Sequence, residues 1–496
     1  MNLNNPIALI GTLIIALFLA LFLGSSIAQE DYIQVYLAFL LMGTPMVLFI
    51  MKKNYWVFIP FALLCGLPAI PLIPGRSVAL KEIWIALSLM MFLGQIIISR
   101  NRNLKLTGIE FIPIYVITAW VVVTFFLDGA GLAILGSSDM GGRKYVGIIL
   151  AVLSLLIISQ QKVSEAQCKL LIRIILAATF VASIVALVNY FFFRVISVEK
   201  EQWASQYYTY HQILSNFPLI LITYIFSKYT LPELIIRTKI KATMALAVSY
   251  PLILYSGKRM HLVLAIMIPV IASIIRKQYM AAFAMCAAAV LFICGAIASV
   301  SMLDKLPGSV ERAFSFIDYI PGVEFNSNRI KTTNFRETLN EIAIEKIQKH
   351  PFIGNGLSVS EAEVLEYEAM EQYALEDVDS HAYLMAAGSS WHNTWLGIST
   401  DFGIPCTIIF AIFWLQLFRY AFQLRRQLPV GSYARLLVTF LLIMNLGALL
   451  QSWVAGHSLE DILWQRGWQF GVLLALRLQL RDGAEQNDFR SKQAIN

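Results

Sequence analysis

Long apolar runs constrain this chain more than any other feature. The stretches IALIGTLIIALFLALFLG (7–24) and MAAFAMCAAAVLFICGAIASV (280–300) approach or exceed the ~20 residues that a helix needs to cross a bilayer. Of the 496 residues, 58% are hydrophobic and only 14% are charged, whereas a soluble domain carries about a quarter charged residues. We therefore predict an all-α, polytopic integral membrane protein.

Comparable apolar segments recur along the chain. We expect membrane helices at about 7–27, 32–51, 55–74, 80–98, 109–127, 144–160, 169–196, 213–231, 242–257, 259–275, 279–300, 394–418, 433–455 and 460–478. Proline or tight connections break the regions around 55–74 and 242–275, so we expect about 12–14 crossings. The first run has no preceding lysine or arginine and no convincing cleavage site, which predicts a retained helix instead of a signal peptide.

Lysine and arginine indicate the orientation. They gather in short loops that usually face the cytoplasm, here 52–54, 100–105, 237–241, 276–278 and 419–427. With alternating sides, both termini are expected in the cytoplasm and residues 301–393 outside, in the periplasm of a Gram-negative cell.

The expected organisation follows from this orientation. Transmembrane helices fill 1–300, a periplasmic loop domain fills 301–393, C-terminal transmembrane helices fill 394–478, and 479–496 form a cytoplasmic tail. The formal charge of +7 then reflects cytoplasmic loops in contact with membrane lipids and does not predict a nucleic-acid partner. The five cysteines contain no CxxC pair, which argues against a disulfide framework or a zinc site.

The outer segment is expected to be partly helical, because structureless loops beyond ~15 residues are uncommon. In FRETLNEIAIEKIQKH (335–350), Leu339, Ile342, Ala343 and Ile347 fall on one helical face. The glycines and proline of HPFIGNG (350–356) should then end that helix. The acidic run 361–379 is expected to be a solvated helix, with a divalent-cation site as the alternative; it lacks the EF-hand pattern.

A cationic pair at the outer end of one apolar helix favours anion binding. Lys258 and Arg259 lie in YSGKRMHLVLA (255–265). An arginine at the centre of a membrane helix costs at least ~2.5 kcal/mol on insertion scales and normally has a partner, although near an interface it can simply snorkel. Arg336 in the outer loop carries a guanidinium that suits a phosphate. Its alternative is a solvated helix arginine.

His392 is the candidate base. It lies in SSWHNTWLGISTDFGIP (389–405), where a polar stretch gives way to an apolar helix. Imidazole titrates near neutral pH and can accept a proton from a hydroxyl. The alternatives are that His392 caps the following helix, or forms interfacial hydrogen bonds beside Trp391 and Trp395. We expect these two tryptophans to be residues of the membrane-interface belt.

The remaining histidines are weaker candidates. His211, with Tyr207 and Tyr210 in YYTYHQ (207–212), could contact sugar rings or belong to a plain interfacial aromatic cluster. His457 is expected on the outer side in a structural role, and His261 is expected to be buried. The sequence has no HExxH, GxSxG or P-loop motif, so protease, hydrolase and ATPase activities lack their usual signatures.

The motifs together resemble the bacterial O-antigen ligases and the related Wzy-type polysaccharide polymerases. Members of that family have an arginine after a small-polar run, here YSGKR ending at Arg259. A loop arginine then precedes an hP-hydrophobic-GxG motif by about fifteen residues, here Arg336 before HPFIGNG. An HN pair and a helix containing G-hydrophobic-PG follow, here HNTWLGISTDFGIPC. The resemblance covers roughly 255–410; the N-terminal helices match only as background.

Three positions depart from the family pattern. Asn340 stands where the family often has an aromatic residue, Cys406 replaces the last glycine, and Lys258 occupies a position often filled by serine.

The resemblance implies a GT-C-like membrane glycosyltransferase of the bacterial inner membrane, with its active site facing the periplasm. The donor would be a glycan on undecaprenyl diphosphate, with the diphosphate held by Arg259, Arg336 and Lys258. His392 would act as base toward the acceptor hydroxyl or orient it, with Asn393, Tyr207, Tyr210 and His211 as glycan or acceptor contacts. Fixed cations could replace a metal ion, so neither metal nor cofactor is expected.

Three functions are compatible with the sequence. The favoured one is an O-antigen ligase joining O-antigen to lipid A-core during lipopolysaccharide biosynthesis. A Wzy-type polymerase that lengthens O-antigen or exopolysaccharide is the first alternative. A secondary transporter is the second, although such proteins tend to show inverted repeats and ionisable groups near mid-membrane, and neither is visible here.

Overall fold

The computed structural model describes residues 52–64, 70–73, 76–78, 80–99, 106, 108–128, 142–196, 215–235, 239–298, 314, 328–357, 386, 391–454 and 456–495. Nearly all of them are helical, so the predicted all-α class is confirmed. The expected helices 7–27 and 32–51 lie outside the described residues.

The described helices follow the apolar runs of the sequence closely. They are η1 (Lys52–Val57), α3 (Phe58–Leu64), α4 (Leu80–Ser99), η2 (Ile109–Phe111), α5 (Ile112–Asp128), α6 (Gly142–Ser159), α7 (Glu165–Ile196), α9 (Asn216–Lys228), α10 (Leu231–Ile235), α11 (Ile240–Tyr255), α12 (Arg259–Ile275), α13 (Tyr279–Ala298), α16 (Asn328–Lys349), α19 (Thr394–Gln427), α20 (Tyr433–Ser452) and α21 (Leu459–Ile495).

Four stretches among the described residues are long and apolar enough to cross a membrane: Ile109–Leu127, Glu165–Leu187, Thr394–Gln427 and Tyr433–Ser452. Shorter apolar helices accompany them. The chain is thus a polytopic membrane protein, while the count of 12–14 crossings stays a prediction. α21 continues to Ile495 and so includes most of the expected tail.

The expected span 55–74 is wrong as a single helix. α3 ends at Leu64, and a short antiparallel hairpin follows, formed by β1 (Ile70–Ile73) and β2 (Arg76–Val78). The sequence between 66 and 75 contains one glycine near each end and three prolines. Proline removes a backbone donor and clashes with the preceding turn of a helix, so this apolar stretch does not continue α3.

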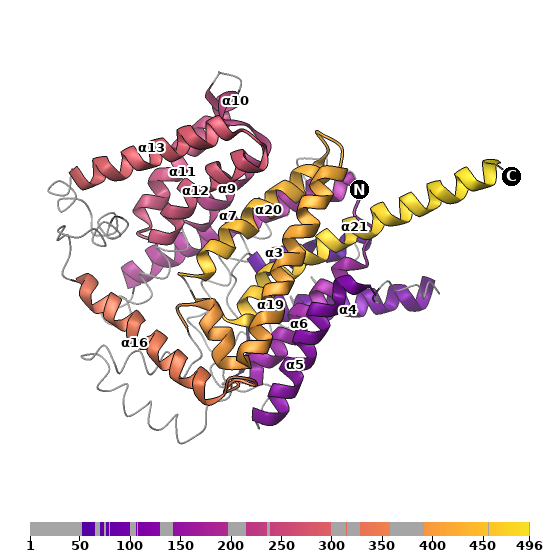
Figure 1. Cartoon of the computed structure of the whole chain (residues 1–496), viewed down its shortest axis with the longest axis horizontal. Coiled ribbons are helices and arrows are strands. Elements are labelled where there is room, and N and C mark those ends of the chain that lie inside the picture. Colours follow the sequence, from indigo (N-terminus) through magenta and orange to yellow (C-terminus); the bar gives the residue numbers. More distant parts are fainter. Residues whose placement is uncertain are drawn as a thin grey trace.

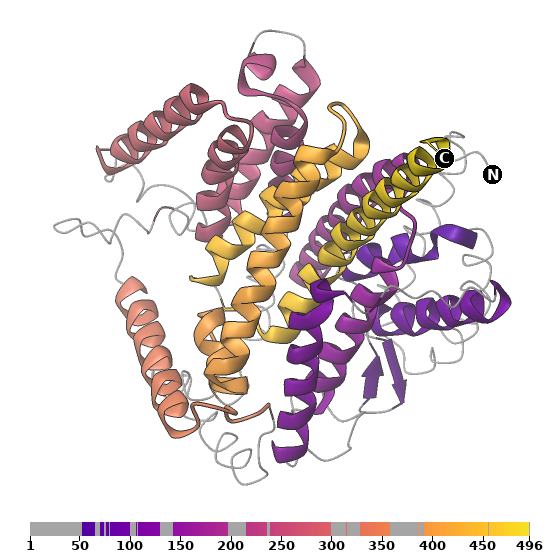
Figure 2. The ribbon, with the colours of Figure 1, turned by 45° about the vertical axis from the view of Figure 1, so that its right-hand side comes forward.

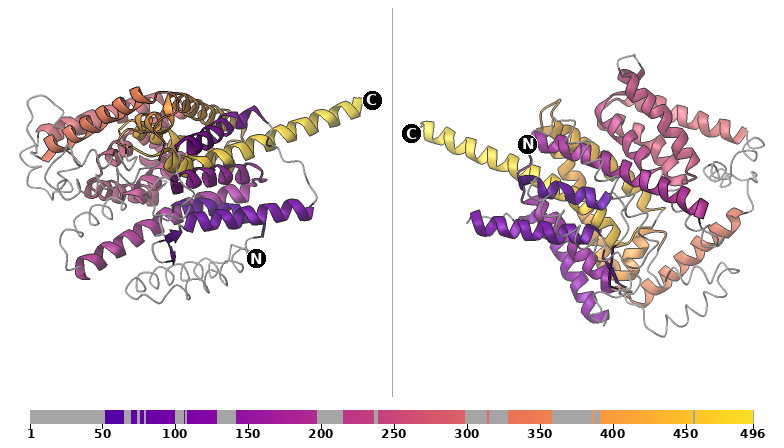
Figure 3. Two further views of the ribbon diagram at one scale, coloured as in Figure 1. Left: turned by 90° about the horizontal axis from the view of Figure 1, so that it is seen from below. Right: turned by 180° about the vertical axis from the view of Figure 1, so that it is seen from behind.

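The three C-terminal helices run through the middle of the molecule. In Figure 1, α9, α11, α12 and α13 gather on one side of α19 and α20, and α4, α5 and α6 on the other. α20 contacts α7, α9, α12 and α19, while α19 also contacts α5 and α21. The far end of α21 extends beyond the bundle (Figure 3).

α21 packs closely along α6. A Cβ at Gly467 would lie 3.5 Å from the carbonyl of Ala151, and one at Gly471 would lie 2.8 Å from the carbonyl of Leu155. Gly467 and Gly471 are four residues apart, the spacing that lets membrane helices approach at their backbones. This small-residue face fixes α21 against the N-terminal half of the chain.

α16 is the amphipathic helix predicted in the outer segment. Leu339, Ile342 and Ala343 are buried together with Ala386 and Trp391, as the periodicity indicated. Figure 2 shows α16 beside the beginning of α19 and apart from the other helices. It ends at Lys349, directly before the proline and glycines that were expected to end it.

Candidate functional site

α19 is interrupted near its start. Gly403 has φ 80° and ψ 166° inside an otherwise helical run, and Pro405 follows it. The backbone groups freed by this kink are paired with residues of the HPFIGNG segment. Asn355 N donates to Thr400 O at 2.8 Å, Gly356 N donates to Asp401 O at 2.9 Å, and Ile404 N donates to Pro351 O at 2.8 Å.

Two glycines allow this close approach. A Cβ at Gly403 would collide with the carbonyl of Phe352, and a Cβ at Gly354 would collide with the peptide between Asp401 and Phe402. Gly354 also has a positive φ of 79°, which glycine adopts without strain. Residues 351–357 and 400–404 therefore form one backbone unit, here called the motif lock.

The motif lock is attached to helices from the first half of the chain. Trp120 Nε1 of α5 donates to Phe402 O at 2.8 Å. Leu357 N donates to Tyr145 Oη of α6 at 3.0 Å. These bonds satisfy polar backbone groups at a kink and hold the start of α19 in a fixed place.

Trp391 is not a membrane-belt residue, so that expectation is wrong for it. Its side chain is 7% exposed, and its Nε1 donates to Asp401 Oδ1 at 3.0 Å. Gly397 leaves room for the ring, and Lys346 of α16 lies 5.7 Å from the ring centroid. Trp391 thus joins α16 to α19.

The helix cap at the start of α19 is Asn393, not His392. Asn393 Oδ1 accepts from Trp395 N at 2.9 Å and from Leu396 N at 3.2 Å. Asparagine is among the best residues at this position. The half-buried His392 is therefore not needed as the cap, while the expected glycan contact of Asn393 stays a prediction beside this structural role.

The turn between α20 and α21 lies against His392. A Cβ at Gly456 would collide with the backbone of Trp391 and His392, so the two segments touch directly. His457 N donates to Thr394 Oγ1 at 3.0 Å, and the His457 ring lies 3.3 Å from Gln451 Nε2 of α20. This turn brings a second histidine next to His392.

The cationic pair at the start of α12 lies near that second histidine. Gly257, with φ 66°, turns the chain, Lys258 is the residue that precedes the helix, and Arg259 begins it. Burial lowers the pKa of Lys258. Burial also lowers the pKa of His457; Asp461 opposes this, while the positive charges of Arg466 and Lys258 add to it. Lys258 and His457 are therefore close enough to interact.

The structure thus brings three parts of the chain to one end of the helix bundle. They are the start of α12, the start of α19 and the α20–α21 turn. We call Lys258, Arg259, His392 and His457 the polar site. Neither Arg259 nor His392 is without a partner.

Comparison with known proteins identifies the central part of this arrangement. Residues 242–411 match the family model described as O-Antigen ligase. Through these residues the chain is similar to the O-antigen ligases. The match covers about a third of the chain, from α11 to the first turns of α19 after the kink. No match was found among the curated proteins compared with the chain.

The O-antigen ligase match includes Lys258, Arg259 and His392 but ends before the α20–α21 turn. That turn is held by the first residues of α21. Ser458 and Asp461 cap the helix reciprocally, with Ser458 Oγ 2.9 Å from Asp461 Oδ2 and Asp461 N donating to Ser458 Oγ at 3.1 Å. The cap fixes the residues that directly follow His457.

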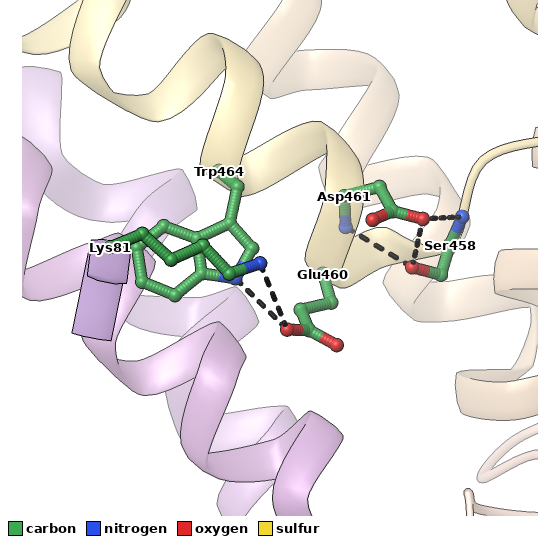
Figure 4. A network of polar contacts seen from close by, with 5 residues as sticks. All are labelled: Lys81, Ser458, Glu460, Asp461 and Trp464. Atoms are coloured by element: carbon green, nitrogen blue, oxygen red, sulfur yellow. Dashed lines mark hydrogen bonds and ion pairs between the residues drawn. The ribbon is translucent and has the colours of Figure 1, made fainter. Parts of the chain in front are cut away.

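A second contact secures the same helix end to α4 (Figure 4). Glu460 Oε1 accepts from Trp464 Nε1 at 2.9 Å and lies 3.9 Å from Lys81 Nζ. Lys81 also lies over the Trp464 ring, 4.7 Å from its centroid. This network leaves little freedom to the α20–α21 turn.

For the other predicted site residues, the described contacts do not include the polar site. Arg336 lies half-buried on α16, one helical turn before Leu339, and its approach to the polar site stays a prediction. His261 is 4% exposed, as expected, with Nδ1 2.6 Å from Ser215 Oγ. Tyr207, Tyr210, His211 and the acidic run 361–379 lie outside the described residues.

Sequence reasoning gave His457 only a structural role and missed Arg466. Both lie in the C-terminal part of the chain, far in sequence from the O-antigen ligase motifs. The available signal was the arginine in ILWQRGWQF, since an ionisable residue within an apolar run is a functional candidate by default.

Proposed function

We propose that the chain is a membrane glycosyltransferase that moves a glycan from a lipid diphosphate to a sugar hydroxyl. Within this class we favour the O-antigen ligase reaction, with undecaprenyl diphosphate as the donor lipid and lipid A-core as the acceptor. The observation that carries the proposal is that His392 and Lys258 both lie near the α20–α21 turn. His392 touches Gly456 of that turn, and the charge of Lys258 acts on the neighbouring His457. His392, Lys258 and the adjacent Arg259 all lie inside the residues that match O-antigen ligases.

The chemistry follows from the residue types. The acceptor hydroxyl oxygen forms a bond to the anomeric carbon of the donor sugar, and the bond from that carbon to the diphosphate oxygen breaks. His392 accepts the hydroxyl proton. Lys258 and Arg259, with Arg336 from α16, stabilise the negative charge on the departing diphosphate. The loop aromatics Tyr207 and Tyr210, with His211 and Asn393, are proposed to contact the glycan or acceptor.

The surroundings of the site support a lipid-linked donor. The cations and His392 lie at the ends of apolar helices, where a lipid tail can remain in the bilayer while its diphosphate meets water. We propose that this end faces the periplasm of a bacterial inner membrane and that both termini are cytoplasmic.

We propose that transfer needs no metal ion, because fixed cations can stabilise the leaving group. Among the described residues, no group of three or more His, Cys, Asp or Glu side chains could hold one. Transfer by the purified protein should therefore continue in EDTA. Loss of activity in EDTA, restored by magnesium or calcium, would contradict this part of the proposal.

The deciding experiment compares lipopolysaccharide from a deletion strain with that from strains expressing wild type or His392→Ala. For a ligase we expect O-antigen bands to disappear in the deletion and in His392→Ala, while lipid-linked glycan accumulates. Core carrying a single repeat unit, without longer bands, would indicate a polymerase instead. Solute uptake into proteoliposomes without any glycan transfer would indicate a transporter and overturn the proposal.

A further inference from the structure

A further cation reaches the polar site from α21. Arg466 lies on this helix two turns after its start at Leu459. We propose that Arg466 is an additional diphosphate contact, which holds the leaving group together with Lys258. The inference rests on the function proposed above and adds to it a residue outside the segment that matches O-antigen ligases.

The rotation of α21 places Arg466 toward α20. Asn445 Nδ2 of α20 donates to Gln469 Oε1 of α21 at 2.6 Å, and both side chains are buried. Arg466 lies three residues before Gln469, so it occupies the same helical face one turn nearer the polar site. Long helical side chains also point toward the N-terminal end of their helix, which directs the guanidinium to the α20–α21 turn.

α20 connects this face to the start of α12. It packs against α12, and Gln451 at its end lies beside the His457 ring. The charges of Arg466 and Lys258 both act on that ring. Arg466 and Lys258 thus both lie within electrostatic reach of His457.

Nothing within the described residues neutralises the side chains of Lys258 and Arg466. The side chains of Arg466 and Lys258 make no ion pair or hydrogen bond there, and neither is fully exposed. The nearby carboxylate of Asp461 is engaged by Ser458 in the helix cap. Keeping a charge partly out of water is unfavourable unless a partner compensates it.

A diphosphate has the chemistry to be that partner. It carries negative charge on two neighbouring phosphorus centres, so two cations from different helices can each contact one. Arginine offers a planar fork for one phosphate, and lysine offers a point charge for the other. A single carboxylate could compensate only one of them.

The test uses the full chain purified in detergent and inorganic pyrophosphate as the probe, titrated by calorimetry. We expect Arg466→Gln to weaken pyrophosphate binding at least tenfold and Arg466→Lys to weaken it less. Arg426→Gln is the matched control, because Arg426 is exposed at the far end of α19. Its affinity should equal that of wild type.

Stability of the ligand-free protein separates ligand binding from a structural role. Removing an uncompensated cation should leave the unfolding midpoint of Arg466→Gln equal to or above that of wild type. A structural arginine would lower it. Wild-type affinity in a folded Arg466→Gln, or in Arg466→Lys if the first variant does not fold, would overturn the inference.

The same titration distinguishes this inference from the proposed function. Weaker binding in Arg259→Gln with wild-type binding in Arg466→Gln overturns only the role of Arg466. Unchanged glycan transfer in His392→Ala overturns the proposed mechanism, whatever the titration shows. A pyrophosphate signal that is equal in wild type and Arg466→Gln and insensitive to Arg259→Gln indicates an adventitious ion only, and also overturns the inference.

Discussion

The motif lock and the polar site lie next to each other but are built in opposite ways. The lock is held by backbone hydrogen bonds and by glycines that admit no side chain. The polar site and the neighbouring Arg466 instead hold cations, and the described part of the chain offers no ion pair to the side chains of Lys258 and Arg466. Both contain residues of the family motifs, yet one set shapes the backbone and the other supplies charge. Resemblance alone does not separate these two roles.

The largest effect should come from the polar site and appear in activity alone. We expect His392→Ala to reduce glycan transfer by about 10²–10⁴-fold, since a positioned base contributes that much. Expression and the unfolding midpoint should stay unchanged. The matched control is His350→Ala, an exposed histidine at the end of α16, measured in the same transfer assay. Equal activity in both variants would remove His392 from the mechanism.

In the motif lock, a single methyl group should damage stability. Gly403→Ala would place a side chain at φ 80° and against the carbonyl of Phe352, and we expect it to cost about 3 kcal/mol or more. Gly431→Ala is the control, because Gly431 has φ 87° but nothing within 4 Å of a Cβ.

The control isolates backbone strain, which costs of order 1 kcal/mol. Thermal unfolding of the two variants in detergent measures the difference. Similar unfolding midpoints for Gly403→Ala and Gly431→Ala would mean that the two segments of the motif lock can move apart without loss of stability.

Substitutions of Asn393 distinguish a structural role of this residue from a role in glycan binding. Asn393→Ala should lower stability by about 1 kcal/mol through loss of the α19 cap, and Asn393→Ser should restore most of it. If capping is its role, transfer will recover with stability in the serine variant. Restored stability without restored transfer would instead support a direct contact with the glycan or acceptor.

The smallest effect should be a pH dependence from His457. Because its pKa in the folded protein lies below its ordinary value, the unfolded chain binds the proton more tightly. The free energy of unfolding should therefore fall as the pH drops below about 6.5. Lys258, Arg466, Asp461 and His261 are the charged or titratable groups that interact with it.

His457→Gln should make the unfolding midpoint less sensitive to pH between 7 and 5, and His350→Gln should leave that sensitivity unchanged. An identical pH profile in wild type and His457→Gln would show that the charge on His457 does not influence folding.

The sequence predicted the elements better than their contacts. Periodicity identified the buried face of α16, and apolar runs located α12, α20 and the start of α19 within a few residues, while α19 continues nine residues beyond its predicted end. The apolar runs did not reveal the hairpin after α3, because the mean hydropathy of the twenty-residue span 55–74 is high despite its prolines. Trp391 was also misplaced, since its partner Asp401 becomes visible only once the kink in α19 is known.

His457 and Arg466 illustrate a more general limit. Their relation to Lys258 arises from the packing of α20 between α12 and α21, which links residues about two hundred positions apart. A single histidine or arginine in a sequence carries no information about such a neighbour. The GxxxG face of α21 could have indicated close helix packing, but not which helix it meets.

The attachment of α16 has a mechanical consequence. Its C-terminal end leads directly into the motif lock, so this end is a fixed pivot. Arg336 lies thirteen residues before Lys349, about 20 Å along the helix at 1.5 Å per residue. A tilt of about 10° at the pivot would move Arg336 by roughly 3 Å, enough to make or break a hydrogen bond. The position of Arg336 therefore depends on the angle between α16 and the motif lock. Lys258 and Arg259, by contrast, lie directly in the helix bundle.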